Sequence, residues 1–377
     1  MFKSLAALLV LAVPAAAKVP TPVETIGTEA GNIKVTEVAG GFNHPWGIEI
    51  LPDGRALVTE KPGRLRLISA DGQLQKAPIG GTPQVWANGQ GGLLDVVADP
   101  NFQNNQLIWL SFAEPGDGDS AGTAVGRGRL ADGRLEDFQT VWRQTTKVTG
   151  PNHFGSRIAF EDDDILFVTL GDRYKFQPAQ ELSNTLGSVI RITRKGQPAE
   201  GNPFLDRDDA EPEIFSYGHR NIQAAALNPK DQTLYVAEMG PLGGDELNKI
   251  KKGVNYGWPV VSWGTDYDGE DIPDPPTHPE FEDALAVWTP VIAPSGMIFY
   301  QGDAFSAFQG DALIGGLVSQ GLSRVRITGD DALALEHIPL GQRIRDVAED
   351  AQGHLYVLID RADGMVWKLQ PLSADAS

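Results

Sequence analysis

The sequence contains no cysteine and only six histidines among its 377 residues. The absence of cysteine excludes disulfide bridges, thiolate metal sites and a cysteine nucleophile. The chain also has no phosphate-binding loop of the type GxxxxGK[ST], no GxGxxG between a strand and a helix, and no HExxH zinc motif. Phosphate-cradling enzymes, dinucleotide-binding domains and zinc proteases are therefore disfavoured.

The remaining composition favours an exported, acidic protein. The chain begins with MFKSLAALLVLAVPAAA, in which a lysine precedes a short apolar run and small residues, so we interpret residues 1–17 as a cleaved export signal. The apolar run is too short to span a bilayer, and no membrane insertion is expected. Export without cysteine suits a bacterial periplasm. The formal charge of −19 repels phosphate backbones, so no nucleic-acid partner is expected.

A repeated strand pattern runs through residues 18–377, which we interpret as one domain. Each copy has an alternating strand, a turn such as PDG or DDD, and a strand of the type xLYVxx. The first of six copies is WGIEILPDGRALVTEKPGRLRLI. With 43 glycines and 26 prolines, the pattern predicts an all-β, six-bladed β-propeller of four-stranded antiparallel blades. The early segment NIKVTEVA is expected to complete the last blade; a β-helix or two stacked β-sandwiches are the alternatives.

Polar side chains recur directly before the first strand of several copies. In a propeller this strand lines the central channel, so the preceding residues gather around one mouth of the ring. A concave, partly cationic surface on an acidic protein is typical of a site for an anionic ligand. The residues at this position are His44, Gln90, His153, Arg220, Asn221, Arg343 and Arg345.

His153 and Asp172 form the candidate catalytic pair. Asp172 follows the second strand of the copy that His153 precedes, so a hairpin can bring the two side chains together. A carboxylate bonded to one imidazole nitrogen fixes the tautomer and raises the basicity of the other nitrogen, as a general base requires. Taken alone, the pair would be a loop histidine and a turn residue. Its coincidence with the other mouth residues favours the catalytic interpretation.

The other histidines are interpreted as structural. His44 is expected to pack beside Pro45 and Trp46, and His219 to support the neighbouring Arg220. The histidines placed in loops or outer positions are His278, His337 and His354.

A second dense stretch, EMGPLGGDELNKIKKGVNYGWP, follows the second strand of the fourth copy. It offers main-chain carbonyls in a tight turn with carboxylates nearby, and calcium takes about six to eight oxygen ligands, many from loop backbone. A glycine-rich turn with a solvated acidic end is an equal alternative. The acidic loop at residues 264–271 lacks EF-hand spacing, so we interpret it as solvated. The candidate calcium ligands are Gly240, Pro241, Asp245, Glu246 and Tyr256.

Together these motifs resemble those of the soluble pyrroloquinoline quinone (PQQ)-dependent glucose and aldose sugar dehydrogenases, which are exported six-bladed propellers. The resemblance extends in order over most of the chain. The matching stretches are NHPWGIEILPDG, GQGGLLDVVADPNF, NHFGSRIAF, SNTLGSVIRI, YGHRNIQ, EMGPLGGDELN, NYGWP and RIRDV.

The resemblance implies a PQQ- and calcium-dependent enzyme that oxidises aldose sugars at C1 to lactones. His153 would remove the proton of the anomeric hydroxyl, Asp172 would orient His153, and Arg220 would stabilise developing negative charge. The residues implied to hold PQQ are Gln90, His153, Arg220, Asn221, Ser319, Arg343 and Arg345, and those implied to serve calcium are Gly240, Pro241, Asp245, Glu246 and Tyr256.

One segment departs from the resemblance. Where the glucose enzymes carry a PQQ-binding lysine, this chain has LVSQGL, with Ser319 or Gln320 at that place. The chain is also short for the glucose subgroup. Both features favour the broader aldose dehydrogenase group and an affinity for PQQ below that of the glucose enzymes.

Two other functions fit parts of the sequence. A calcium-dependent propeller sugar lactonase would also use mouth carboxylates and a histidine, but a small neutral lactone gives no reason for three arginines there. A non-catalytic binding propeller would not need the pair of His153 and Asp172. The dehydrogenase would have a small aldose and a soluble or membrane-linked electron acceptor as partners, and the sequence leaves monomer and homodimer open.

Overall fold

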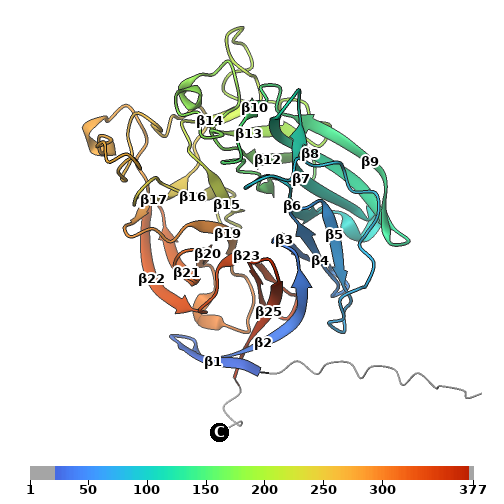
Figure 1. The fold of residues 1–377 in the computed structure, drawn as a ribbon. Helices are drawn as coiled ribbons and strands as arrows, with labels where there is room; N and C mark the ends of the chain where they lie inside the picture. The colour runs from blue at the N-terminus through green and yellow to red at the C-terminus, as the bar shows by residue number, and fades with distance from the viewer. Residues whose placement is uncertain (1–21, 373–377) are drawn as a thin grey trace, which may run out of the picture.

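Six antiparallel sheets surround a central channel in the computed structural model, which describes residues 22–372 (Figure 1). This arrangement confirms the predicted six-bladed β-propeller. The expected export signal at residues 1–17 lies outside the described residues. Across residues 22–372, no helix has the length and apolar character needed to cross a membrane.

The first three blades follow the chain in order from the inside outward. Blade one contains β3 (Pro45–Ile50), β4 (Ala56–Glu60) and β5 (Arg64–Ile68). Blade two contains β6 (Leu93–Ala98), β7 (Leu107–Pro115), β8 (Ser120–Ala131), β9 (Arg134–Arg143) and β10 (Val148–Thr149), with the short helix α1 (Phe102–Asn105) between β6 and β7. Blade three contains β11 (Ile158–Phe160), β12 (Ile165–Thr169), β13 (Ser188–Thr193) and β14 (Ile214–Tyr217).

The last three blades continue in the same way. Blade four contains β15 (Ile222–Leu227), β16 (Leu234–Glu238), β17 (Asp245–Lys249) and β18 (Ala286–Trp288). Blade five contains β19 (Pro294–Phe299), β20 (Ala312–Gly316), β21 (Gly321–Thr328) and β22 (Asp331–Pro339). Blade six contains β23 (Ile344–Glu349), β24 (Leu355–Ile359), β25 (Gly364–Pro371), β2 (Gly31–Phe42) and β1 (Pro22–Thr28). Three 3₁₀ turns lie in loops, at Gln177–Gln180, Pro275–Thr277 and Ser306–Phe308.

The two ends of the chain close the ring within blade six. The early strand β2 pairs antiparallel with the C-terminal strand β25, so the predicted role of NIKVTEVA is confirmed (Figure 1). Val35 of β2 lies opposite Leu369 of β25, and both side chains are buried in one apolar cluster. Burial of such pairs stabilises the closed ring by removing apolar surface from water.

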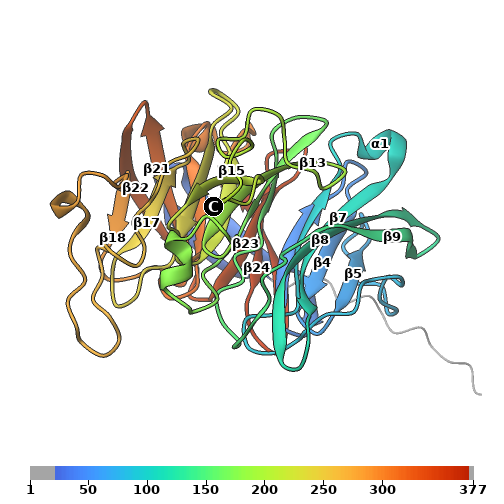
Figure 2. The ribbon, with the colours of Figure 1, turned by 90° about the horizontal axis from the view of Figure 1, so that it is seen from above.

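The number of strands per blade varies around the predicted four. Blades three, four and five have four strands each, whereas blades two and six have five and blade one has three. In blade one the main-chain N–H groups of Gln75 and Ile79 bond to the carbonyls of Leu67 and Leu65, so an irregular segment occupies the fourth place. The long segment between β17 and β18 projects beyond the blades (Figure 2).

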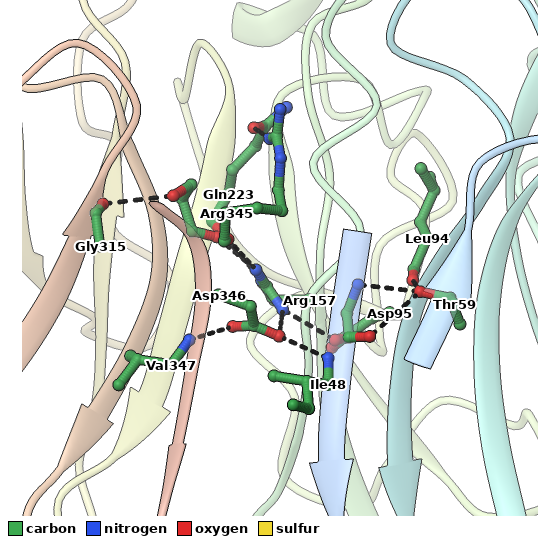
Figure 3. A network of polar contacts seen from close by, with 12 residues as sticks. Ile48, Thr59, Leu94, Asp95, Arg157, Gln223, Gly315, Arg345, Asp346 and Val347 are labelled. Carbon is green, nitrogen blue, oxygen red and sulfur yellow. Dashed lines mark hydrogen bonds and ion pairs between the residues drawn. The ribbon is translucent and has the colours of Figure 1, made fainter. Parts of the chain in front are cut away.

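A buried guanidinium occupies the centre of the channel. Arg157 is only 5% exposed, and its Nη1 donates to Asp95 of blade two at 2.8 Å and to Asp346 of blade six at 3.0 Å (Figure 3). Its Nε donates to the main-chain carbonyl of Gln223 in blade four at 2.8 Å. Its Nη2 donates to the carbonyl of Ser295 in blade five. Five blades therefore meet at one side chain, counting blade three, which supplies Arg157.

The two carboxylates extend this network to the main chain. Asp346 accepts the N–H of Ile48 in blade one at 3.0 Å, and Asp95 accepts the N–H of Ile158 at 2.9 Å. Burial raises the pKa of Asp95 to about 6, and Arg157 opposes that shift by its positive charge. All six innermost strands are thus connected through Arg157 and its two partners.

Replacement of Arg157 by methionine should strongly destabilise the fold. The change would leave two buried carboxylates without a cation, and breaking a buried pair in this way costs about 3–5 kcal/mol. Urea unfolding of Arg157→Met and of the wild type would measure the difference in the free energy of unfolding.

The matched control is Arg55→Met, because Arg55 pairs with Asp53 at 2.7 Å on the surface. Exposed pairs contribute about 0–1 kcal/mol, so this variant should unfold close to the wild type. Equal stability of the two variants would contradict the central role of Arg157.

Candidate active site

A cavity of about 460 Å³ opens at one end of the channel. It lies where the innermost strands begin and the second strands of the blades end. Among its lining residues, four side chains are cationic and one is a carboxylate, on a protein whose total charge is strongly negative. The lining residues are His44, Trp46, Lys61, Gln90, Gln223, Met239, Ala293, Leu317, Val318, Arg343, Arg345, Asp360 and Arg361.

His153 and Asp172 are in direct contact beside this cavity. Nδ1 of His153 lies 2.7 Å from Oδ1 of Asp172, and both side chains are buried. An ionised Asp172 only accepts hydrogen bonds, so the neutral imidazole carries its proton on Nδ1 and leaves Nε2 as the basic nitrogen. Burial lowers the pKa of His153 below its usual value, although Asp172 opposes that shift. The imidazole is therefore neutral and able to accept a proton at pH 7.

Asp172 also organises the loop that follows it. Its carboxylate accepts the indole N–H of Trp258 at 2.8 Å and the main-chain N–H of Tyr174 at 2.7 Å. Burial alone would raise the pKa of Asp172, but these donors and His153 hold that pKa below its usual value. Tyr174 and Phe176 have positive φ angles of 59° and 64°, which aromatic residues adopt at a cost of order 1–3 kcal/mol. Such strain next to a catalytic candidate is typical of a functional loop.

Gln90 and Asn221 fix the main chain around His153. Oε1 of Gln90 accepts the N–H of His153 at 2.9 Å, and Oδ1 of Asn221 accepts the N–H of Gly155 at 3.2 Å. His153 itself has a positive φ of 56°, so both side chains help to hold an uncommon backbone conformation. Gln90 lines the cavity as well, which connects His153 to the cavity wall.

Arg220 lies on the side of the site formed by blade four. Its Nη1 donates to the carbonyls of Met239 at 3.1 Å and Gly240 at 2.9 Å. The guanidinium lies over the ring of Trp258 at 5.1 Å, and its Nε is buried without a hydrogen-bond partner. Met239 lines the cavity, so Arg220 is held at its border.

Arg343 and Arg345 share one carboxylate. Oδ2 of Asp360 lies 3.2 Å from Arg343 and 2.7 Å from Arg345. Arg345 also donates to Oε1 of Gln223 at 2.8 Å, and its Nε is buried without a partner. Two guanidiniums with one counterion leave a net positive charge on this wall, as the sequence suggested.

The segment that departs from the resemblance reaches the cavity through residues other than Ser319. Leu317 and Val318 line the cavity, and Val318 is 53% exposed. The hydroxyl of Ser319 is buried and has no hydrogen-bond partner. Position 318 is therefore the exposed position of this segment from which a longer side chain could enter the cavity.

Two of the predicted calcium ligands are already hydrogen-bonded to the main chain. The carboxylate of Asp245 accepts the N–H groups of Gly240, Ile292 and Ala293 at 2.9, 2.8 and 2.6 Å. The hydroxyl of Tyr256 donates to the carbonyl of Lys249 at 2.6 Å and accepts the N–H of Lys251 at 2.9 Å. Both residues shape the turn in this structure, and a role as calcium ligands stays a prediction.

Glu246 faces a second carboxylate that the sequence analysis did not single out. It lies opposite Glu238 in the pairing of β16 with β17, and Nδ2 of Asn248 donates to both side chains at 3.1 Å. Burial and the nearby Glu238 raise the pKa of Glu246 to about 8. Both glutamates line a small cavity of about 10 Å³ together with Gly240 and Tyr256, which leaves room for about one water-sized occupant. A cation there would relieve the repulsion between the two carboxylates.

The remaining predictions concern single residues. His44 was expected at the mouth and to pack beside Pro45 and Trp46, and it lines the cavity together with Trp46. His219 is buried, and its Nδ1 bonds at 2.8 Å to Glu238, which also accepts the main-chain N–H of Arg220. In the acidic loop 264–271, Asp268 accepts the N–H of Glu270 at 2.9 Å and both residues are exposed. Within residues 22–372, no group of three or more His, Cys, Asp or Glu side chains is placed to hold a metal ion.

The sequence analysis did not single out several lining residues, because they follow the second strand of a blade rather than precede the first. Lys61 directly follows β4, Met239 follows β16, and Asp360 follows β24. Asp172 and Gly240 come from the corresponding places in blades three and four. The repeat could have identified these residues. The second, xLYVxx-type strand of a blade runs antiparallel to the channel strand, so it ends at the mouth where the channel strands begin.

Comparisons with known proteins agree with this architecture. The family model for glucose / sorbosone dehydrogenase matches residues 42–368. The aldose sugar dehydrogenase of Escherichia coli strain K12 is 41% identical over 346 residues, covering 90% of this chain and 93% of that protein. The crystal structure of the soluble aldose sugar dehydrogenase from E. coli in the apo-form has a TM-score of 0.85 at 40% identity, covering 90% of this chain and 100% of that chain.

A more distant solved relative is the PQQ-bound aldose sugar dehydrogenase of Streptomyces coelicolor. It has a TM-score of 0.73 at 27% identity and covers 95% of this chain and 99% of that chain. The residues matched by the family model extend from the end of β2 into β25 and include the whole cavity lining, so the likeness is not confined to the scaffold. This chain belongs to the glucose / sorbosone dehydrogenase family of oxidoreductases.

Proposed function

We propose that this protein oxidises aldose sugars at C1 to lactones, with PQQ as the redox cofactor and calcium as a bound ion. The observation that carries the proposal is the cationic cavity, which Gln90 connects to the buried pair of His153 and Asp172. The name of the S. coelicolor relative supports PQQ as the cofactor. We further propose that the protein is exported to the periplasm, on the basis of residues 1–17.

The residues around the cavity fit a ligand with several carboxylates. Arg220 and Arg345 each have a buried Nε without a partner, and Arg343 and Arg345 share the single carboxylate of Asp360. Buried unpaired donors are costly, so an anionic ligand that accepts from them would be bound favourably. PQQ carries three carboxylates. The cavity residues proposed to hold it are Gln90, Arg343 and Arg345, with His153, Arg220 and Asn221 at the border and Ser319 behind the wall.

The proposed chemistry needs a base for the hydroxyl proton of the sugar. PQQ, when bound, supplies a quinone that can accept a hydride from C1 of the sugar. Nε2 of His153 takes the hydroxyl proton, because burial keeps the imidazole neutral and Asp172 holds its proton on Nδ1. Arg220 provides positive charge at the border of the cavity, where negative charge develops on oxygen. Loss of the hydride and the proton converts the cyclic aldose to its lactone.

The residues near Gly240 fit calcium in part. Bound calcium supplies Lewis acidity and neutralises carboxylates. The buried Glu238 and the half-buried Glu246 provide acidic oxygens, whereas three main-chain amides already donate to Asp245. The carbonyl of Gly240 has a second lone pair besides the one that accepts from Arg220, and Pro241 adds another carbonyl. We therefore expect Glu246, Glu238 and the Gly240–Pro241 turn to contribute more than Asp245 or Tyr256.

The proposal makes the cofactor and the ion dependent on each other. Arg220 bonds to the carbonyl of Gly240, so the proposed cofactor side and the proposed calcium side share one turn. Calorimetric titration with PQQ should show clearly weaker binding after chelator treatment, and calcium should restore both binding and sugar-dependent reduction of the quinone.

Two outcomes would count against the proposal. Equal PQQ affinity with and without calcium would disprove the proposed dependence of PQQ binding on calcium. No PQQ binding in either condition would favour a sugar lactonase or a non-catalytic binding propeller, although neither gives a reason for the arginines in the cavity.

The base can be tested by substitution. His153→Ala should lower the rate of sugar oxidation by roughly 10²–10⁴-fold, the usual contribution of a general base, while PQQ binding persists. In the wild type, kcat/KM should fall with acid below the ordinary histidine pKa of about 6.5, because burial lowers the pKa of His153.

Asp172→Asn supplies the control for the pH dependence. Asp172 raises the pKa of His153, so this variant should move the acid limb to still lower pH and retain more activity than His153→Ala. Near-normal turnover of His153→Ala would remove His153 from the mechanism, and a larger loss in Asp172→Asn would make Asp172 the base.

The segment at residues 317–320 offers a test of cofactor recognition. Val318→Lys would place a cation on the cavity wall, so it should tighten PQQ binding by roughly two- to fivefold, as expected for a partly exposed ion pair. Ser319→Lys would place the side chain where the hydroxyl is buried, so it should lower the unfolding temperature without tightening PQQ. Tighter binding by Ser319→Lys alone would contradict the placement of this segment.

A further inference from the structure

We propose that Lys61 is an anion-binding residue of the cavity and holds a carboxylate of the cofactor. Residues 317–320, which also reach the cavity, contain no cationic side chain that could do so. The inference rests on the proposed function. Lys61 comes from blade one, whereas Arg343 and Arg345 come from blade six. All three side chains line the same cavity.

The main chain fixes the position of Lys61 between blades one and two. Its N–H donates to the carbonyl of His44 at 3.0 Å, and its carbonyl accepts the N–H of Leu93 at 3.0 Å. A Cβ at Gly92 would lie 2.2 Å from the carbonyl of Lys61, so only glycine allows this close approach. The side chain therefore starts from a fixed point on the cavity wall.

The ammonium group of Lys61 lacks a counterion. Nζ donates to the carbonyl of Gly89 at 3.0 Å, and in the part of the chain from residue 22 to residue 372 no carboxylate lies within 4 Å of it. The acidic group whose charge acts on it is Asp360, which already pairs with Arg343 and Arg345. Three cations thus surround one carboxylate.

This arrangement is unfavourable until an anion arrives. Burial lowers the pKa of Lys61, and the positive charges of Arg345 and Arg343 add to that shift. Arg345 is only 8% exposed and keeps one buried N–H without a partner. A ligand carboxylate between these side chains would accept from that donor and screen the repulsion among the cations.

A purely structural role for Lys61 makes a different prediction. If its hydrogen bond to Gly89 were its only contribution, removal of the ammonium would destabilise the free protein and leave ligand binding unchanged. If it binds an anion, removal of a half-buried cation among like charges should leave the free protein equally or more stable and should weaken binding.

The experiment compares Lys61→Met with Lys76→Met in the calcium-loaded protein. Lys76 is an exposed lysine of the same blade outside the cavity, so its replacement controls for the change in net charge. Calorimetry should show PQQ binding weakened roughly 10–100-fold by Lys61→Met, the range for a hydrogen bond between charged groups. Lys76→Met should bind like the wild type, and Lys61→Arg should recover most of the affinity. The unfolding temperature of free Lys61→Met should be equal to or above that of the wild type.

Citrate, a tricarboxylate without redox chemistry, separates this inference from the proposed function. If the wild type fails to bind PQQ but citrate raises its unfolding temperature more than that of Lys61→Met, Lys61 is an anion-binding residue and the cofactor is wrong. If the wild type binds PQQ and Lys61→Met binds it equally well, the inference fails while the proposed function stands. A lowered unfolding temperature with unchanged PQQ and citrate binding would assign Lys61 the structural role.

Discussion

The buried guanidinium of Arg157 is the constraint on which the rest of the molecule depends. A propeller has no covalent tie between its first and last blades, and its channel strands must be held at a fixed distance from the axis. Arg157 satisfies carboxylates or carbonyls from blades two, four, five and six, and Asp346 extends the contact to blade one. Because an unpaired charge at this depth is costly, the six strands can open only together.

The same contact positions the floor of the candidate active-site cavity. Arg157 does not line the cavity itself, but it donates to the main-chain carbonyls of Gln223 and Arg345. The side chains of those two residues extend into the cavity and bond to each other at 2.8 Å. Arg345 is proposed to bind the cofactor. The hydrogen bond from Arg157 to the main-chain carbonyl of Arg345 thus helps to position its side chain. Strand β23 therefore contributes both to the network at the axis, through Asp346, and to the cavity wall, through Arg345.

The sequence predicted the fold and the first position of the repeat because both follow from short-range patterns. Alternating strands and PDG-type turns identify blades, and the residues before each channel strand include His153 and Arg345. The contact between His153 and Asp172 was also predictable, since one hairpin joins them. The contacts of Trp258 with Asp172 and of Glu238 with Glu246 were not predictable, because separation along the chain does not show where a side chain points. Neither were the hydrogen bonds that Asp245 accepts from the main chain of Gly240 and from that of Ile292 and Ala293, which precede β19.

The charge of the cavity differs from that of the protein as a whole. The protein as a whole is acidic, so an anionic ligand is repelled at a distance and attracted only near the mouth, where the cations outnumber Asp360. Screening by salt weakens the distant repulsion more than the interactions inside the cavity, since buried charges are less exposed to ions. The unfavourable proximity of Lys61 to Arg343 and Arg345 persists because the Arg157 network and the β-ladders hold their strands in place. We expect such a site to favour a multiply charged anion, because a single carboxylate would leave part of the repulsion uncompensated.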